Sequence, residues 1–135
     1  MDAPTHFLSK DDHRTIDEIT VDEMDTEGVV LDFTGKKPNT AIARKQLAER
    51  AEAYDLSAEE YIILDCGMAP ADTDRYLRKF VYPSEGAAEY LRETDIACLA
   101  VDALSADKPG ASIDNHPVHR TLLPEDILIL TAINT

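Results

Sequence analysis

The first residues of the chain place a carboxylate and an imidazole close together. The sequence opens with MDAPTHF, in which His6 follows Asp2 by four positions. Pro4 lies between them and fixes its own backbone angle, which stiffens the segment that joins the two side chains. Carboxylate oxygen and imidazole nitrogen are ligands that suit zinc or manganese. Taken alone, however, so short a pattern favours an irregular loop over a metal site.

A second group of candidate residues occurs near the end of the chain, in the stretch NHPVHRTLLPEDILIL. It places His116 and His119 in a loop rich in chain-breaking residues, directly before an apolar strand. Side chains in such loops often build sites on a rigid scaffold. The alternative is a surface loop whose histidines and Arg120 form a basic patch, and the sequence favours neither. The remaining histidine, His13 in KDDHR, is expected to be exposed and to have no role.

Apolar runs that alternate with amphipathic segments predict an α/β domain with a mixed sheet. Strands are expected at residues 28–33, 60–68, 96–104 and 126–133, and helices at residues 40–54 and 84–94. The helix at 40–54 is predicted from apolar residues, Ile42 to Tyr54, that recur near helical spacing. Residues 1–27 offer only a weak pattern of turns and short helices, and residues 69–80 a loop or a short helix.

Length and charge limit the class of protein and its partners. The 135 residues correspond to one domain, or part of one, over residues 1–135. Thirteen basic residues against 27 acidic ones give a net charge of −14, which repels nucleic acid and anionic membranes. No apolar run approaches the roughly 20 residues that cross a bilayer, and the start does not read as a signal peptide. Nucleic acid and membranes are therefore not expected partners, and the acidity is interpreted as a solubility device.

Two cysteines lie inside predicted strands. Cys66 ends the run YIILDC, and Cys98 lies in IACLAVDAL. Buried strand positions are common for free thiols, and neither cysteine has the CxxC spacing of a redox or zinc motif. A disulfide between them stays open as an alternative, but a reduced, cytoplasmic chain is the expectation.

Taken together, these segments resemble the cyclase-like, kynurenine formamidase family of metal-dependent hydrolases. MDAPTHF is similar to the second half of the family signature His-x-Gly-Thr-His-x-Asp-x-Pro-x-His, with Asp2, Pro4 and His6 at its fixed positions. SEGAAEYL and IACLAVDALSAD are similar to the family's helix and its strand followed by Asp-x-x-Ser, here Asp102 and Ser105. HPVHRTLLPEDILIL is similar to the family's His-Arg-x-Leu-Leu stretch and following strand. The resemblance covers nearly the whole chain in order and implies a swivelling β/β/α fold.

The resemblance implies roles for three side chains. Asp2 and His119 would be ligands of a divalent metal, zinc or manganese, and His6 would be the catalytic general acid/base. The two histidines that open the family signature would precede Met1. The N-terminal part of the domain is therefore expected to be missing, and Met1 to be an internal methionine of a longer ancestral domain.

The sequence departs from the family pattern at a further ligand position. A glutamate normally stands twelve positions after His119, where this chain has Thr131. A neutral hydroxyl cannot offset the charge of a divalent ion as a carboxylate does, and such a site needs several protein ligands. Glu125 and Asp126 lie nearby in sequence, but they precede the expected position and would need a shifted register.

The resemblance and the departures from it leave two functions open. The first is metal-dependent hydrolysis of an amide or ester, for which the family implies N-formylkynurenine, isatin-like lactams and other cyclic amides or lactones. The second is a catalytically impaired fragment that serves as a ligand-binding or scaffold subunit. Thr131 favours the second, while Asp2, His6 and His119 favour the first. An acidic interaction module has only the net charge in its favour. The family also implies self-association into dimers or tetramers.

Overall fold

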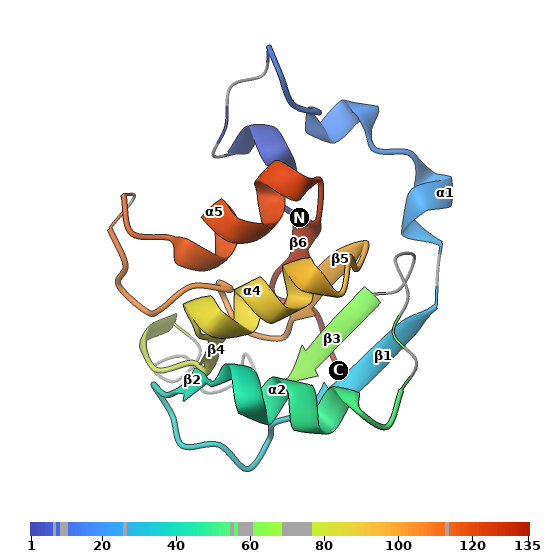
Figure 1. Ribbon diagram of the computed structural model, residues 1–135. Helices are drawn as coiled ribbons and strands as arrows, with labels where there is room; N and C mark the ends of the chain where they lie inside the picture. The colour runs from blue at the N-terminus through green and yellow to red at the C-terminus, as the bar shows by residue number, and fades with distance from the viewer. Residues whose placement is uncertain are drawn as a thin grey trace.

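The computed structural model describes residues 1–6, 8, 11–25, 27–54, 56, 61–68, 77–112 and 114–135. Four parallel strands form the main sheet in the order β1-β3-β5-β6 (Figure 1): β1 (Gly28–Asp32), β3 (Tyr61–Asp65), β5 (Cys98–Val101) and β6 (Leu128–Leu130). A second, two-stranded parallel sheet pairs β2 (Ala41–Ile42) with β4 (Tyr82–Pro83). Among the described residues, the antiparallel direction enters through a bridge between Asp2 and Ile129. The predicted α/β class with a mixed sheet is therefore confirmed.

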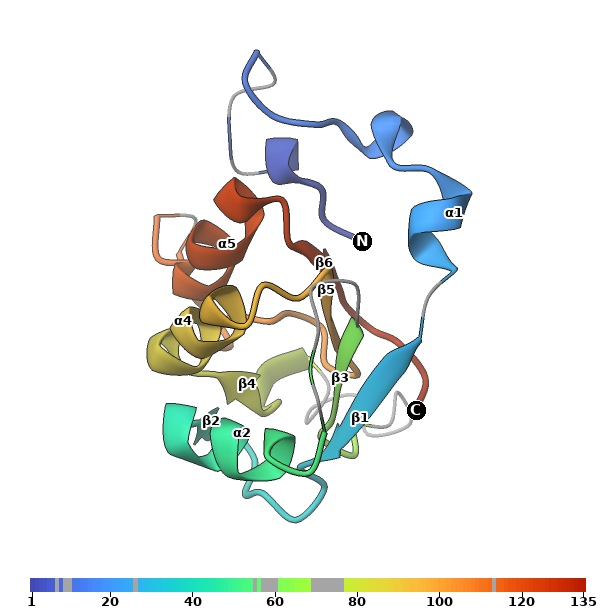
Figure 2. The same cartoon turned by 45° about the vertical axis from the view of Figure 1, so that its right-hand side comes forward.

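Helices cover one face of the main sheet. Figure 2 shows α2 (Arg44–Ala51), α4 (Glu85–Glu93) and α5 (Pro117–Leu122) side by side on that face. The strands alternate their side chains between the two faces, so the buried cluster between sheet and helices draws on every second strand residue. Its main strand members are Leu31, Ile62, Leu64, Leu99, Val101 and Ile129, and its main helix members are Leu47, Ala88, Leu91, Val118 and Leu122.

The opposite face of the sheet has a smaller apolar cluster. Tyr61, Cys98 and Leu128 lie there on neighbouring strands, and Ile19 and Met24 pack against them. Met24 ends the short helix α1 (Val21–Met24), which follows the 3-10 helix η2 (Ile16–Glu18). The segment before β1 is thus the element that covers this part of the sheet.

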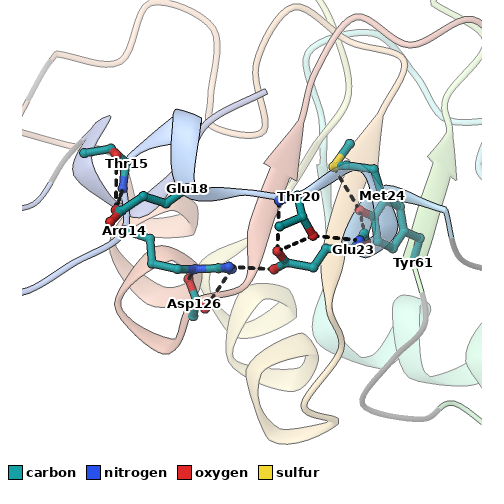
Figure 3. A network of polar contacts seen from close by, with 8 residues as sticks. All are labelled: Arg14, Thr15, Glu18, Thr20, Glu23, Met24, Tyr61 and Asp126. Atoms are coloured by element: carbon teal, nitrogen blue, oxygen red, sulfur yellow. Dashed lines mark hydrogen bonds and ion pairs between the residues drawn. The ribbon is translucent and has the colours of Figure 1, made fainter.

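Arg14 ties the segment of residues 14–24, here called the N-terminal strap, to the edge of the sheet. Its guanidinium contacts both carboxylate oxygens of Asp126, at 3.0 and 2.9 Å, and Glu23 at 2.5 Å (Figure 3). Glu23 also accepts from the backbone of Thr20 at 2.9 Å, which caps α1. The hydroxyl of Tyr61 in β3 donates to the carbonyl of Glu23 at 3.1 Å. Asp126 lies two residues before β6. The strap is therefore bound at one end of the β3-β5-β6 region, next to β6, through Asp126 and at the other, in β3, through Tyr61.

The sequence predicts the helix at residues 84–94 well and the helix at 40–54 only in part. Ser84 caps α4 by accepting from the backbone of Ala87. The other predicted helix begins late, at Arg44, because Ile42 pairs with Pro83 in the small sheet instead. A β-branched, fully buried side chain suits such a strand. Tyr54 lies beyond the helix and is 46% exposed, so it is not part of the apolar stripe.

The prediction that His119 lies in a loop is wrong. Residues 117–122 form helix α5, followed by the 3-10 helix η3 (Leu123–Glu125). Pro117 occupies the first helical turn, where its fixed backbone angle and missing N–H favour a helix start. Pro117 therefore begins a helix here, whereas the sequence pattern predicts that the prolines of this stretch keep it in an irregular loop.

The other predicted elements are shorter than expected or fall partly outside the described residues. The four predicted strands are present with trimmed ends, and most of the segment predicted as a loop or short helix, residues 69–76, lies outside the described residues, as does residue 60. Cys66 and Cys98 are buried free thiols, as predicted. Burial raises the pKa of Cys98 to about 12. In the part of the chain that the structure describes, no helix has the length and apolar character needed to span a membrane.

The packing of α4 against its neighbours gives a direct test of this core. Leu91 is fully buried between the helices and the sheet. Replacing it with alanine removes buried methyl groups and leaves a cavity, so Leu91→Ala is expected to lower the free energy of unfolding by about 2–5 kcal/mol. Urea denaturation measures the change. The matched control is Leu104→Ala, whose side chain is 43% exposed and which should cost less than about 1 kcal/mol. Equal losses would contradict the packing described.

Candidate active site

The backbone of Asp2 is fixed by the last strand. The N–H of Asp2 donates to the carbonyl of Ile129 at 2.7 Å, and the N–H of Ile129 donates back to Asp2 at 3.3 Å. Immediately afterwards, the 3-10 helix η1 (Pro4–His6) turns the chain, with the N–H of His6 donating to the carbonyl of Ala3. In Figure 1, this helix lies beside α5. The opening motif is therefore part of the folded domain.

The side chain of Asp2 lies between two histidines. One carboxylate oxygen contacts Nδ1 of His6 at 3.1 Å, and the other contacts Nε2 of His119 at 3.3 Å. Asp2 is 19% exposed, His119 5% and His6 56%. The structure thus brings the three residues that the sequence singled out into one cluster, in which the imidazole from α5 is buried and the imidazole from η1 faces outward.

A fourth residue, Asp107, belongs to the same cluster. Its carboxylate contacts Nδ1 of His119 at 2.5 Å and is 1% exposed. Asp107 was not among the candidates from the sequence. It lies within IACLAVDALSAD, two positions after Ser105, whose hydroxyl accepts from its backbone N–H at 3.1 Å. A carboxylate placed before a candidate metal-binding histidine was the signal that could have indicated it, because such histidines usually bind a carboxylate through their second nitrogen.

The two carboxylates set the protonation of the buried imidazole. Burial by itself would lower the pKa of His119, but its contacts with Asp107 and Asp2 outweigh that effect and raise the pKa to about 9. In return, the hydrogen bond with His119 lowers the pKa of Asp2. In the metal-free chain at neutral pH, His119 is therefore a cation held between two carboxylates.

The donor set around Asp2 fits a divalent cation in part. Two ligand atoms that bind one tetrahedral ion at about 2.0–2.2 Å lie about 3.4 Å apart. The 3.3 Å between Oδ2 of Asp2 and Nε2 of His119 matches that spacing. Within the described ranges, however, no group of three or more His, Cys, Asp or Glu side chains is arranged to hold an ion. Asp2 and His119 therefore fit as two ligands of a set that these residues do not complete.

The other candidates near this site do not enlarge the set. Thr131 directly follows β6 and offers no carboxylate. Asp126, a candidate only in a shifted register, is bound by Arg14, and Glu125 is exposed in η3. The ring of His116 lies edge-on to His119, with 5.6 Å between the ring centroids.

A cavity opens beside the outward-facing histidine. Met1, Ala3, His6, Thr15 and Ile16 line a space of about 300 Å³. Three of its five lining residues are apolar, and His6 and Thr15 add an imidazole and a hydroxyl. Such a mixed lining suits a small organic molecule. A second cavity of similar size lies at the carboxyl ends of the parallel strands and is lined by Asp65, Asp102 and residues 133–135 among others. Among the described residues, the lining of this second cavity offers two carboxylates and no histidine. The cavity beside His6 differs from it by adjoining the cluster around Asp2.

The raised pKa of His119 predicts a loss of stability at alkaline pH. Because its folded pKa of about 9 exceeds the ordinary value of 6.5, the contribution is fully present below pH 6.5 and is lost as the pH rises through 9. The loss in the metal-free chain should be on the order of 3 kcal/mol, measured by urea denaturation from pH 6 to pH 10. His119→Gln should be less stable at pH 6 but should lack this decline, whereas His13→Gln should keep it. A decline of equal size in the His119→Gln chain would contradict the assignment.

Comparison with solved structures identifies the fold. An isatin hydrolase bound to the product analogue thioisatinate matches with a TM-score of 0.84 at 19% identity, over 99% of this chain and 57% of that one. Isatin hydrolase A from Labrenzia aggregata, bound to benzyl benzoate, matches with a TM-score of 0.85 at 17% identity, over 99% and 58%. A protein described as a predicted metal-dependent hydrolase, from Bacillus stearothermophilus, matches with a TM-score of 0.70 at 21% identity, over 97% and 58%. The predicted cyclase-like fold is therefore confirmed.

The family is shown by a direct match of the sequence. The chain spans less than two thirds of the solved structures above, and comparison with curated proteins gives no match. A family model described as "Cyclase: Putative cyclase" matches residues 1–108, which include the motif around Asp2 and the segment that contains Asp107. Because this model covers most of the chain, the protein belongs to the cyclase family, whose fold it shares with metal-dependent hydrolases.

Proposed function

We propose that this chain is part of a divalent-metal-dependent hydrolase that cleaves the amide or ester bond of a small cyclic or formylated substrate. The single observation that carries the proposal is the convergence of Asp2, His6 and His119, from opposite ends of the chain, with Asp2 in contact with both imidazoles. Family membership and the likeness to isatin hydrolases support it. Isatin and N-formylkynurenine are the substrates that we propose to test first.

In this proposal Asp2 and His119 bind the cation, and His6 transfers the proton. When bound, the divalent ion would polarise the substrate carbonyl and lower the pKa of a water molecule. Asp2 and His119 would hold it, zinc or manganese being the ions that suit carboxylate and imidazole. His6 would move the proton as general acid/base. Its Nδ1 is held by Asp2, and its ring lines the cavity beside it, so the substrate would lie against Nε2.

The surroundings of His6 are consistent with a small substrate. The adjoining cavity of about 300 Å³ has Met1, Ala3 and Ile16 in its lining. These apolar side chains would contact a ring, while His6 and Thr15 would supply polar contacts. The size and lining of the cavity thus favour a compact, partly aromatic substrate over a polymer.

A second function is favoured by the incomplete ligand set. The described residues bring together two ligands, and Thr131 replaces the carboxylate that the family resemblance predicts. A chain with this site and no further ligands would bind a small molecule, or act as a scaffold subunit, without catalysis. The two proposals differ in whether ligands from outside these 135 residues restore metal binding.

Self-association and a reducing compartment also belong to the proposal. The family resemblance implies a dimer or tetramer, which light scattering would measure. Cys66 and Cys98 are free and buried, which is consistent with a reducing compartment such as the cytoplasm.

The ligand count predicts how the chain behaves by itself. The 135-residue chain is expected to bind zinc and manganese weakly and to hydrolyse N-formylkynurenine and isatin poorly or not at all, because two protein ligands are too few. Fusing a His-x-Gly-Thr-His segment ahead of Met1 should restore metal affinity and turnover, and His6→Gln in that fusion should abolish turnover while metal stays bound. Isothermal titration and a hydrolysis assay measure both. A fusion that binds metal tightly but cleaves neither substrate would favour the ligand-binding alternative.

A carboxylate at residue 131 provides a separate test of the ligand positions. Thr131→Glu is expected to raise zinc affinity at least 10-fold, since a missing ligand typically changes affinity by that factor or more. The matched control is Asn134→Glu, which adds the same charge at an exposed position three residues later and should leave the affinity unchanged. Equal gains in the two variants would show that added negative charge, and not a ligand position, attracts the ion.

A further inference from the structure

Asp107 is the most deeply buried carboxylate in contact with the site. One of its oxygens contacts Nδ1 of His119 at 2.5 Å, and its side chain is 1% exposed. A buried charge is costly unless it is paired and hydrogen-bonded. The contacts of Asp107 with His119 and with the backbone of α5 therefore offset the cost of burying its charge.

The position of Asp107 is fixed by the backbone of α5 as well as by the imidazole. Its Oδ1 accepts from the N–H of Val118 at 2.9 Å, and its Oδ2 accepts from the N–H of His119 at 3.3 Å. Both N–H groups belong to the first turn of the helix, where no carbonyl within the helix is available to them. The same Oδ2 that reaches the imidazole is thus anchored to the residue that carries the ring, which leaves the ring little freedom to rotate.

Two carboxylates compete for the proton of the neutral imidazole. Asp107 lies 2.5 Å from Nδ1 and is 1% exposed, whereas Asp2 lies 3.3 Å from Nε2 and is 19% exposed. The shorter contact in the drier surroundings is the stronger one, because a low dielectric strengthens charge-assisted hydrogen bonds. The neutral ring therefore keeps its proton on Nδ1 and presents the lone pair of Nε2 toward Asp2.

We propose that Asp107 is the positioning residue of the site: it holds His119 in the one tautomer and orientation in which Nε2 can bind a divalent cation beside Asp2. The inference rests on the proposed function for the cation, but the tautomer itself requires no metal. Asp107 touches neither substrate nor cation. It acts through His119, and it couples the loop after β5 to the first turn of α5.

The wild-type chain provides the first test, without metal. Long-range proton–nitrogen NMR correlations of the His119 ring are recorded at a pH high enough for the ring to be neutral. The expected result is a protonated Nδ1 and a bare Nε2. A protonated Nε2 would overturn the proposal, because that nitrogen could not then serve as a ligand.

The Asp107→Asn variant separates two roles of Asp107, the capping of α5 and the choice of the His119 tautomer. The amide keeps an oxygen for the N–H of Val118 but must turn its NH₂ group toward Nδ1, which then accepts. The neutral ring should carry its proton on Nε2. Affinity for Zn²⁺, followed at the ring resonances of His119 so that ions bound elsewhere do not count, should fall by about 10- to 100-fold. An unchanged tautomer or an unchanged Zn²⁺ affinity would overturn the proposal.

The matched control is Asp102→Asn. Asp102 is also a buried carboxylate that accepts from two backbone N–H groups, those of Cys66 and Met68, at 3.0 and 2.7 Å. No contact with His119 is among its hydrogen bonds. This variant should keep the wild-type tautomer and Zn²⁺ affinity, and an equal loss here would show that Asp107 acts only through general packing.

A further variant covers the case in which the Asp107→Asn chain does not fold. Asp2→Asn removes the competing carboxylate and leaves Asp107 in place, so Nδ1 should remain protonated, and a switch to Nε2 would overturn the proposal. Because two ligands alone bind Zn²⁺ weakly, the affinities are compared in the chain extended by the His-x-Gly-Thr-His segment. If the tautomers behave as expected but the His119 ring of that extended chain does not respond to Zn²⁺, the metal of the proposed function is wrong while the positioning role of Asp107 stands.

Discussion

The two backbone hydrogen bonds between Asp2 and Ile129 are the constraint on which the candidate site depends. The start of a chain commonly frays unless it is tied down. Here it adds one antiparallel bridge to the edge strand β6, which is itself paired with the buried strand β5. The carboxylate of Asp2 is thereby held against α5, within 3.3 Å of His119. Asp2 and His119, separated by nearly the whole chain, become neighbours because Asp2 bridges to β6, and α5 precedes that strand with only the short helix η3 and two further residues between them.

The fork between Arg14 and Asp126 supports the same arrangement from outside. Both residues are partly exposed, so this pair contributes little to stability by itself. Its position matters more than its strength, because it joins the strap over the outer face of the sheet to the turn that leads into β6. The strap also supplies Thr15 and Ile16 to the cavity beside His6. The strap therefore adjoins the site, because residues of both line the same cavity.

Negative charge has two separate uses in this molecule. Most of the 27 acidic residues serve the surface, where a large net charge keeps a protein soluble. Asp102 and Asp107 are buried instead, and each accepts hydrogen bonds from two backbone N–H groups. Desolvation raises the pKa of Asp102, while Asp107 faces a cationic imidazole. Similar burial thus gives one carboxylate a structural part and the other a part in the site.

The sequence by itself determined the alternation of strands and helices, the buried thiols and the family to which the motif around Asp2 belongs. These follow from local patterns: the spacing of apolar residues sets the elements, and three fixed motif positions carry the resemblance. Pro117 at a helix start is a local signal that the sequence pattern already contained. Only the tertiary structure decided that Ile42 joins a strand and that Asp107 caps the first turn of α5 and reaches His119. In each case a partner distant in sequence made the difference: Pro83 for Ile42, and for α5 the carboxylate of Asp107, which accepts from its first N–H groups. Local propensity cannot reveal such contacts, because they exist only once the chain has folded.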